Sequence, residues 1–335
     1  MDLHGIVLAL RAAGLRVAGA AFAAPHPTAA RATFHRSGAG WVRLDWEGEP
    51  DEAAAAAVLA SPRGEARFVS CADLARAAVA LAGKLPPDAA GIAGVPRSGM
   101  APAAVIATLL QLPLWEAGDV LRRVGHGGRG GQVGFARDRG RLVVVDDTVY
   151  SGASMERACR AAGGGVVRAA VFCKPESAGA VDVFAEPLPS PHLLEWNLFN
   201  SAVLRGQATD PFFAGGVAAD LDGVLLHDER SGGPPGTPYM LPRTLPAPLI
   251  VTGRPESVRA ETEAQLRHWG CRWERLEMAP PGADPARHKA AHYAASRCGV
   301  FVESDPEQAQ EIFERCGKPV VCPRTGRVWS ERSEP

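Results

Sequence analysis

Residues 142–154 read LVVVDDTVYSGAS, and this stretch decides how the central part of the chain folds. Its apolar start predicts a buried strand, and two adjacent carboxylates, Asp146 and Asp147, follow directly. Hydroxyl-bearing residues and Gly152 then lead into a predicted helix. The acidic pair alone leaves two interpretations open: a turn that stops the strand, or a binding site at the edge of a sheet.

The composition is that of a globular protein and excludes several classes of function. A length of 335 residues favours two domains and a small additional segment. The net charge of −1 gives no electrostatic attraction to nucleic acid or membrane surfaces, so we expect neither as a partner. Scattered cysteines without a CxxC pair, no signal-like N-terminus and no apolar run of ~20 residues favour a cytoplasmic location.

We predict an α/β protein with two Rossmann-like parallel-sheet domains and a small N-terminal segment. The segment, residues 1–65, carries no chemical motif and is either a structural extension or a docking or substrate-selecting module. Residues 66–208 and 212–330 each alternate strands with helices, and in the first of these domains we expect helices on both faces of the sheet. The expected elements are strands at 41–46, 91–96, 142–147, 166–173, 249–251, 299–302 and 319–322, and helices at 3–13, 53–57, 71–84, 101–110, 155–162, 256–269 and 288–297.

The residues after the acidic pair are suited to a sugar phosphate. Backbone N–H groups at the start of a helix, beside Gly152, form a cradle for phosphate. The hydroxyls of Thr148, Ser151 and Ser154 add donors. Carboxylates would repel a bare phosphate, but they accept hydrogen bonds from ribose hydroxyls. A ribose with a 5′-phosphate and free 2′ and 3′ hydroxyls therefore fits both the phosphate cradle and the carboxylate acceptors.

LVVVDDTVYSGAS resembles the phosphoribosyl-pyrophosphate (PRPP) loop of type I phosphoribosyltransferases, in which two acidic residues and a Thr-Gly-x-Thr-like loop follow an apolar strand. Ser151 and Ser154 stand where threonines are commoner. Upstream, GVPRSGM (94–100) resembles the pyrophosphate loop of the same family, and the resemblance spans about residues 70–200. The residues that it implies for PRPP binding are Arg97, Ser98, Gly99, Asp146, Asp147, Thr148, Ser151, Gly152 and Ser154.

The resemblance implies displacement of pyrophosphate from C1 of the ribose by a nitrogen base, with Mg²⁺ as cofactor. We expect PRPP and a nitrogen base or nucleotide as partners, a purine-like base being favoured, and a homodimer as a further option. The Gly-rich basic stretch 122–141 is either a functional loop that folds over the site or a solvent loop. Trp196 is either the ring on which the base stacks or a buried core tryptophan.

A second acidic pair, at positions i and i+2, follows the strand that leads into DLDGVL (220–225). Two carboxylates there can act separately, as nucleophile and as acid–base, and Gly223 permits the turn that brings both to the carboxyl edge of the sheet. The string resembles the first motif of the haloacid-dehalogenase-like (HAD) phosphatases. IVTGR (250–254), Lys289 and VFVESDPEQA (300–309) resemble the other three motifs in the same order.

This second resemblance implies a Mg²⁺-dependent phosphatase that forms an aspartyl-phosphate. Asp220 would attack phosphorus, Asp222 would protonate the leaving alkoxide and then activate water, and Lys289 would neutralise charge. Thr252 and Gly253 would bind the phosphate. The implied metal ligands are Asp220, the backbone carbonyl of Asp222, and an acid of the last motif, Glu303 or Asp305, with Glu303 standing where aspartate is usual.

The gaps between the phosphatase-like motifs are too short for a large cap domain, so we expect a HAD-like fold with a minimal cap and an open site. The favoured function is a bifunctional enzyme that transfers phosphoribosyl from PRPP and hydrolyses a phosphomonoester, its own 5′-nucleotide product being one candidate. Two alternatives remain open. The first domain would sense PRPP or a nucleotide as a regulator, or only the phosphatase would turn over.

Overall fold

A computed structural model of the chain describes residues 66–124, 140–188, 192–206 and 211–330, together with the backbone of three N-terminal strands. These strands form one small sheet in which β3 pairs antiparallel with β2 and parallel with β1. Their bounds are β1 (Arg16–Val17), β2 (Arg31–Ser37) and β3 (Trp41–Glu47). The strand predicted at 41–46 is confirmed by β3, whereas the helices predicted at 3–13 and 53–57 lie outside the described residues.

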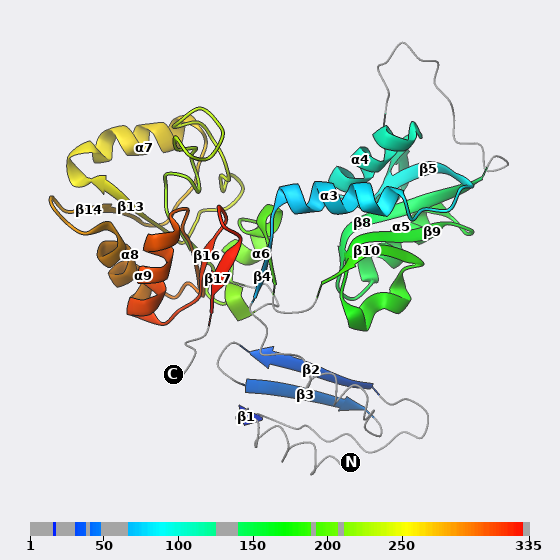
Figure 1. Ribbon diagram of the computed structural model, residues 1–335, viewed down its shortest axis with the longest axis horizontal. Coiled ribbons are helices and arrows are strands. Elements are labelled where there is room, and N and C mark those ends of the chain that lie inside the picture. Colours follow the sequence, from blue (N-terminus) through cyan, green and yellow to red (C-terminus); the bar gives the residue numbers. More distant parts are fainter. Residues whose placement is uncertain are drawn as a thin grey trace. The chain divides into compact units, whose positions relative to one another are not determined.

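The chain divides into two compact units. We call Arg67–Trp196 the central unit, and Met1–Ala66 with Asn197–Pro335 the flanking unit. Each has a six-stranded sheet of its own (Figure 1). The predicted α/β class with mainly parallel sheets is therefore confirmed.

The central sheet has the spatial order β10-β9-β8-β5-β6-β7, and only the pairing of β6 with β7 is antiparallel. A separate pair, β4 with β11, joins the two ends of the unit in parallel. The elements of the central unit are β4 (Arg67–Val69), α3 (Cys71–Ala82), β5 (Ala89–Gly94), α4 (Met100–Leu110), β6 (Leu114–Ala117), β7 (Leu121–Arg123), β8 (Arg141–Val149), α5 (Ala153–Ala162), β9 (Val167–Cys173), η2 (Pro175–Ala180), β10 (Val183–Pro187), β11 (His192–Leu194) and η3 (Glu195–Asn197).

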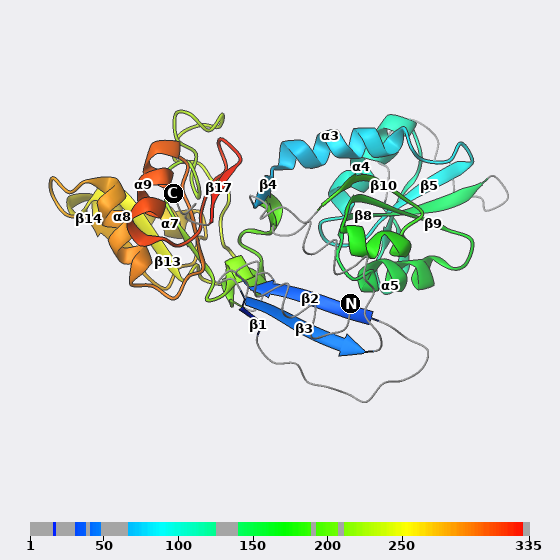
Figure 2. The same ribbon diagram turned by 60° about the horizontal axis from the view of Figure 1, so that its bottom comes forward.

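Strand β8 buries both of its faces, as the run of apolar residues predicts. Val143 and Val145 belong to one core cluster with residues of α3 and α4, and Leu142 and Val144 belong to a second cluster with residues of α5. Successive side chains of a strand point to opposite faces, so the sheet has a core on each side. Figure 2 shows α3 and α4 on one side of the central sheet and α5 on the other. Helices thus cover both faces, as predicted.

The order of the parallel strands reverses between β5 and β8. The chain leaves β5 toward β6 and later returns on the other side of β5 as β8. In open α/β sheets, ligands bind outside the carboxyl ends of the strands at such a reversal. GVPRSGM follows β5, and the acidic pair lies near the end of β8. The topology therefore brings the two predicted PRPP loops to one edge.

The sheet of the flanking unit has the order β14-β13-β12-β15-β16-β17, antiparallel only between β16 and β17. Its order reverses between β12 and β15, and Asp220 and Glu303 follow these two strands directly. The elements are α6 (Ser201–Leu204), η4 (Pro211–Phe213), β12 (Val217–Ala219), β13 (Leu249–Pro255), η5 (Glu256–Val258), α7 (Arg259–His268), β14 (Leu276–Ala279), α8 (Pro285–Ala294), β15 (Val300–Val302), α9 (Pro306–Cys316), β16 (Val320–Cys322) and β17 (Arg327–Trp329).

Two helices of the flanking unit begin with the same local signal. The side chains of Asp284 and Asp305 accept backbone N–H groups at the starts of α8 and α9, and each aspartate is followed by a proline. The helices pack on the sheet through a core that includes Tyr293 and Phe301. These caps fix where Lys289 and Glu303 stand relative to the carboxyl edge of the sheet.

Several element boundaries differ from the sequence prediction. Strand β8 continues to Val149, so Thr148 belongs to the strand rather than to the following loop. The strand predicted at 319–322 is not the last, because β17 follows it. Strands β6, β7, β10 and β14 were not predicted, since they are only three to five residues long and mix apolar with charged residues.

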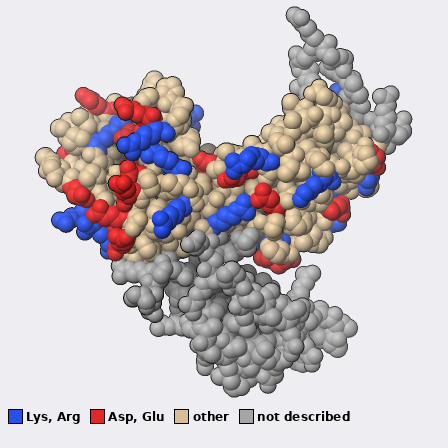
Figure 3. All heavy atoms as spheres, in the orientation of Figure 1, with Lys and Arg blue, Asp and Glu red and all other residues tan. Residues whose placement is uncertain are grey.

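Figure 3 shows basic and acidic side chains interspersed over the visible face of each unit. No helix in the described part of the chain is long and apolar enough to span a bilayer.

Candidate active sites

The loop between β5 and α4 lies directly against the acidic pair of β8. A Cβ added to Gly99 would lie 2.8 Å from Oδ1 of Asp146 and 2.7 Å from the carbonyl oxygen of Val95. Only glycine fits there, because real Cβ atoms do not approach so closely. The predicted pyrophosphate loop, Arg97 to Gly99, therefore lies beside the predicted ribose-binding acids. The peptide bond between Pro96 and Arg97 is cis.

Both carboxyl groups of the acidic pair are buried, with 7% of Asp146 and 4% of Asp147 exposed. Oδ1 of Asp146 accepts the backbone N–H of Asp147 at 2.9 Å. Burial, together with the neighbouring charge of Asp147, raises the pKa of Asp146 to about 8. Asp146 therefore holds a proton at neutral pH and can either donate or accept a hydrogen bond.

The start of α5 provides donors beside the acidic pair. Gly152 precedes the helix with φ of 79° and has no side chain to cap it, and the hydroxyl of Ser151 accepts the backbone N–H of Ala153 at 3.5 Å. Orphan N–H groups at a helix start bind anions. Ser151 and Ser154 lie on either side of Gly152, and Tyr150 hydrogen-bonds through its hydroxyl to Nε2 of His192 on β11. The loop is thereby tied to β11.

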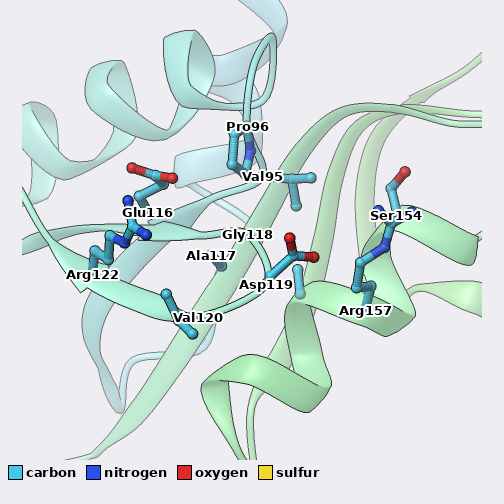
Figure 4. Close-up of a pocket in the computed structure, with 11 residues that line it drawn as sticks. Val95, Pro96, Glu116, Ala117, Gly118, Asp119, Val120, Arg122, Ser154 and Arg157 are labelled. Carbon is cyan, nitrogen blue, oxygen red and sulfur yellow. The ribbon is translucent and has the colours of Figure 1, made fainter.

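A pocket of about 370 Å³ opens beside this loop. Figure 4 shows Glu116 and Arg122 from the β6–β7 hairpin on one side and Ser154 and Arg157 from α5 on the other, with Asp119 between them. A volume of this size is in the range of small-ligand sites. Its lining carries charged groups of both signs.

Trp196 is half-buried and contacts three parts of the central unit. Its Nε1–H donates to Oδ2 of Asp147 at 2.7 Å. Its ring stacks on Phe172 of β9, with the ring centroids 6.4 Å apart and the planes at 21°. Its carbonyl oxygen accepts a hydrogen bond from Nη2 of Arg97 at 3.3 Å. Trp196 thus stands at the acidic pair, with its indole edge engaged by Asp147.

In the flanking unit, Lys289 joins two buried carboxylates. Its Nζ lies 2.9 Å from Oδ2 of Asp220 and 2.6 Å from Oε2 of Glu303, and it also donates to Oε1 of Gln308 at 2.9 Å. Burial, then the charge of Asp220, raises the pKa of Glu303 to about 8, and burial also raises the pKa of Asp220. Although burial acts to lower it, the two carboxylates raise the pKa of Lys289, which remains an ammonium ion.

Asp222 has a different cation beside it. Arg254 binds the Asp222 carboxylate with two hydrogen bonds, Nε to Oδ2 at 2.8 Å and Nη2 to Oδ1 at 2.6 Å. The guanidinium is held in turn by Gln265 at 2.8 Å and Thr262 at 3.3 Å, both on α7. Such a fork fixes the direction of a carboxylate as well as its charge.

The other predicted phosphatase residues lie at the same edge. Thr252 is buried, and its hydroxyl accepts the backbone N–H of Arg254 at 3.2 Å. Gly253 is exposed at the end of β13. Asp305 caps α9 through Oδ1, at 3.0 and 3.1 Å from the first backbone N–H groups, and its Oδ2 lies 3.6 Å from Nη1 of Arg230. Asp305 therefore has a structural role beside the site.

The metal set predicted from the sequence is not drawn together around one point. Within the ranges that the structure describes, no group of three or more His, Cys, Asp and Glu side chains is arranged to hold a metal ion. The backbone carbonyl of Asp222 accepts a hydrogen bond from the hydroxyl of Ser304 at 3.1 Å. Asp220 and Glu303 share one lysine, as described above, and their oxygens remain the best candidates for metal ligands.

Sequence reasoning missed several of these residues. Arg254 directly follows the predicted Thr252-Gly253 pair, so its position near the site could have been inferred from the sequence. Its pairing with Asp222 could not. Glu116 and Asp119 lie in a short hairpin that carries no motif. In the sequence they are marked only by the several charged residues that lie just before and in the Gly-rich basic stretch 122–141.

No family model and no curated protein matches the chain. Among solved structures, a purine phosphoribosyltransferase from Pyrococcus horikoshii Ot3 is 22% identical over 38% of this chain and 92% of its own, with a TM-score of 0.29. A xanthine-guanine-hypoxanthine phosphoribosyltransferase from Helicobacter pylori is 17% identical over 39% of this chain and 91% of its own, with a TM-score of 0.30. An orotate phosphoribosyltransferase from Aeropyrum pernix is 17% identical over 48% of this chain and 88% of its own, with a TM-score of 0.24. Each of these three matches spans less than half of this chain.

Proposed function

We propose that the central unit transfers a phosphoribosyl group from PRPP to a nitrogen base, with purine-like bases favoured. The observation that carries this proposal is the close packing of Gly99 on Asp146, where an added Cβ would lie 2.8 Å from the carboxyl oxygen. It puts the loop that resembles a pyrophosphate site against the pair that resembles a ribose site. Both follow strands at the reversal of strand order, which is the usual ligand position in such sheets.

The role of each group follows from its chemistry. The 5′-phosphate is bound by the N–H groups at the start of α5 and by the hydroxyls of Ser151 and Ser154. Asp146 and Asp147 hold the ribose hydroxyls, which require acceptors in a buried position. The loop 97–99 binds the diphosphate through its arginine and its backbone N–H groups.

The substrate is the magnesium complex of PRPP, whose Mg²⁺ supplies positive charge at the departing diphosphate. The C1–O bond of the ribose breaks, pyrophosphate leaves, and a ring nitrogen of the base forms the new bond to C1, its proton passing to the departing pyrophosphate. Positive charge develops on the ribose as the bond breaks, so the protein must fix the sugar and keep water away from C1. The buried acidic pair performs the first task by its hydrogen bonds to the sugar.

The test is a screen of free bases with PRPP and Mg²⁺, read by mass spectrometry for a base ribosyl 5′-monophosphate and by a pyrophosphate assay. Product and pyrophosphate in equal amounts would support the transfer. Binding of PRPP by calorimetry without pyrophosphate release with any base would identify a sensing domain. A chain that binds no PRPP would contradict the proposal.

We further propose that the flanking unit hydrolyses a phosphomonoester and that its substrate is the 5′-nucleotide made by the central unit. An oxygen of Asp220 attacks phosphorus, and the bond from phosphorus to the alkoxide breaks. Asp222 gives the alkoxide a proton, which requires that it leave its pairing with Arg254 and be protonated for this step. Water then cleaves the aspartyl-phosphate and returns the proton to Asp222. The contact of Lys289 with Asp220 at 2.9 Å supports this assignment, because the ammonium group would also meet the phosphate charge.

The oxygens of Asp220 and Glu303 fit a Mg²⁺ ion by their chemistry. Two buried carboxylates share one lysine, so ionisation of both leaves an excess negative charge that a divalent cation would balance. Bound there, Mg²⁺ supplies charge neutralisation for the phosphate. Phosphate release from a generic phosphomonoester, measured with Mg²⁺ and with a chelator, tests the activity; equal and negligible release in both would contradict it.

Placing the two sites in one chain keeps the intermediate at a high effective concentration near the second site. Hydrolysis would also drain the product of the transfer and make that step effectively irreversible. The expected end products from base and PRPP are therefore a nucleoside, pyrophosphate and inorganic phosphate.

A further inference from the structure

We propose that Trp196 is a positioning residue, which aims the carboxylate of Asp147 at a ribose hydroxyl of PRPP. The inference rests on the proposed phosphoribosyl transfer. Its basis is the hydrogen bond of 2.7 Å from the indole Nε1–H to Oδ2 of Asp147. The base-stacking role predicted from the sequence requires only an aromatic ring at this place, whereas positioning requires the N–H group.

The indole N–H can only donate a hydrogen bond, so it needs an acceptor such as a carboxylate oxygen. Asp147 is 4% exposed, so its carboxylate cannot be oriented by bulk water. Oδ2 accepts the indole hydrogen, and the hydroxyl of Thr148 lies at 3.4 Å from the same oxygen. The indole and the hydroxyl thus both engage Oδ2, and the Asp147 carboxylate also interacts with the neighbouring carboxyl of Asp146. We assign Oδ1 to the substrate.

The indole itself is held so that its N–H cannot turn away. The ring stacks on Phe172, and Trp196 packs against the core cluster that α3 and α4 share with the sheet. The residue before it, Glu195, is buried and accepts the backbone N–H of Cys71 at the start of α3, at 2.6 Å. The side chain and the main chain of this segment are thus fixed independently of Asp147.

Trp196 also links the two halves of the site. Its carbonyl oxygen accepts a hydrogen bond from Arg97, in the loop that would bind the diphosphate, while its indole holds Asp147. The loops after β5 and β8 are therefore connected through one residue that comes from the end of the unit. Correct placement of Trp196 requires both loops to be folded, so it joins the diphosphate and ribose parts of the PRPP site.

The test substitutes Trp196→Phe, which keeps an aromatic ring beside Phe172 and removes the N–H together with the five-membered ring of the indole. We expect the KM for PRPP to rise roughly tenfold, since a hydrogen bond to a charged acceptor is lost, with the KM for the base nearly unchanged. Calorimetry on Trp196→Phe, Asp147→Asn and the double variant should give a non-additive cycle, with the double variant binding PRPP no more weakly than Asp147→Asn.

Trp329→Phe is the matched control. Trp329 is a buried tryptophan of the flanking unit, and its Nε1 has no hydrogen-bond partner among the described residues, so PRPP binding should not change. Near-ultraviolet circular dichroism checks that each variant is folded. Wild type that fails to bind PRPP would overturn the proposed function and this inference together. Wild type that binds, with Trp196→Phe binding equally well or losing affinity only for the base, would overturn the inference alone.

Discussion

The two units of the chain each carry a pair of carboxylates at the reversal point of a parallel sheet, but they treat the negative charge differently. Asp146 and Asp147 form no ion pair with any residue in the described part of the central unit, and one of them keeps its proton. Asp220 and Asp222 each contact a cation. The same position in the same type of sheet therefore holds two electrostatically different sites.

This difference matches the ligands that the two sites would bind. Ribose hydroxyls are neutral and need acceptors, so a cation fixed on the pair would compete with them for the carboxylate oxygens. A transferring phosphoryl group is an anion, and it approaches a carboxylate nucleophile only if cations offset the repulsion. Lys289 and Arg254 supply those cations in the flanking unit. Two acidic residues after a strand can therefore serve different reactions, depending on which side chains contact them.

The largest expected effect is loss of the nucleophile in the flanking unit. Asp220→Asn should lower phosphatase turnover by about a thousandfold or more, because an amide oxygen does not form the covalent intermediate. With PRPP and the accepted base, the variant should accumulate the 5′-monophosphate, whereas wild type should release nucleoside and inorganic phosphate. Mass spectrometry and a phosphate assay measure the two outcomes.

Asp284→Asn is a suitable control for this variant, since asparagine caps a helix as well as aspartate does. Phosphatase turnover at the wild-type rate in Asp220→Asn would show that the nucleophile is a different residue. Wild type that releases only the monophosphate, in the presence of ample Mg²⁺, would show that the two sites serve separate substrates.

The next effect is on stability. Lys289→Met should destabilise the fold by about 3–5 kcal/mol, because Asp220 and Glu303 would remain buried without their shared counter-charge. Denaturant unfolding followed by circular dichroism measures the loss. Adding Glu303→Gln to the same variant removes one of the two carboxylates and should restore part of the stability. An unchanged midpoint in Lys289→Met would mean that the two acids are protonated and need no lysine.

The sequence predicted the main strands because these depend on local patterns, and the candidate residues of both sites were proposed from the same kind of pattern. The apolar runs of β5, β8 and β9 and the strand–helix alternation are visible without any tertiary information. The short strands β6 and β14 were missed, since four residues of mixed polarity do not show an alternation that distinguishes a strand from a loop. What the sequence could not supply was the partner of each acid.

Those partners are set by tertiary structure. Trp196 lies 49 positions from Asp147, and Arg254 lies 32 positions from Asp222. Nothing in the local pattern says that an indole faces one acid and a guanidinium the other. Trp196 is an example. From the sequence it was either the ring on which the base stacks or a buried core tryptophan. In the structure its N–H donates to Asp147, a contact that neither alternative included.

A smaller effect is expected in the central unit, where no lysine or arginine among the described residues forms an ion pair with the acidic pair. Asp147→Ala should weaken PRPP binding by roughly 1.5–3 kcal/mol, the usual loss for a charged acceptor that bonds a hydroxyl. Isothermal calorimetry with PRPP and Mg²⁺ measures the affinity. Asp88→Ala provides the control, because this exposed acid pairs with Arg141 away from the candidate site and its loss should leave binding unchanged. Equal affinities in wild type and Asp147→Ala would remove the acidic pair from the ribose site.

The smallest effect concerns how stability depends on pH, and it tests whether the two pairs differ in protonation. The pKa of Asp146 is about 8 in the folded chain, against about 4 for an aspartate in an unfolded one. Between these values the folded chain binds the additional proton, so the free energy of unfolding should fall as the pH rises, and should level off above about pH 8.

Asp146→Asn removes this titrating group and should flatten the dependence. From pH 6.5 to 7.5, wild type should lose at most about 1.4 kcal/mol more than the variant, which corresponds to one proton per molecule. Denaturant unfolding of both proteins at several pH values measures the difference. If the two curves ran parallel, Asp146 would already be ionised at neutral pH. The central pair would then carry two uncompensated charges, and a bound cation would have to stabilise it, just as Lys289 and Arg254 stabilise the pair in the flanking unit.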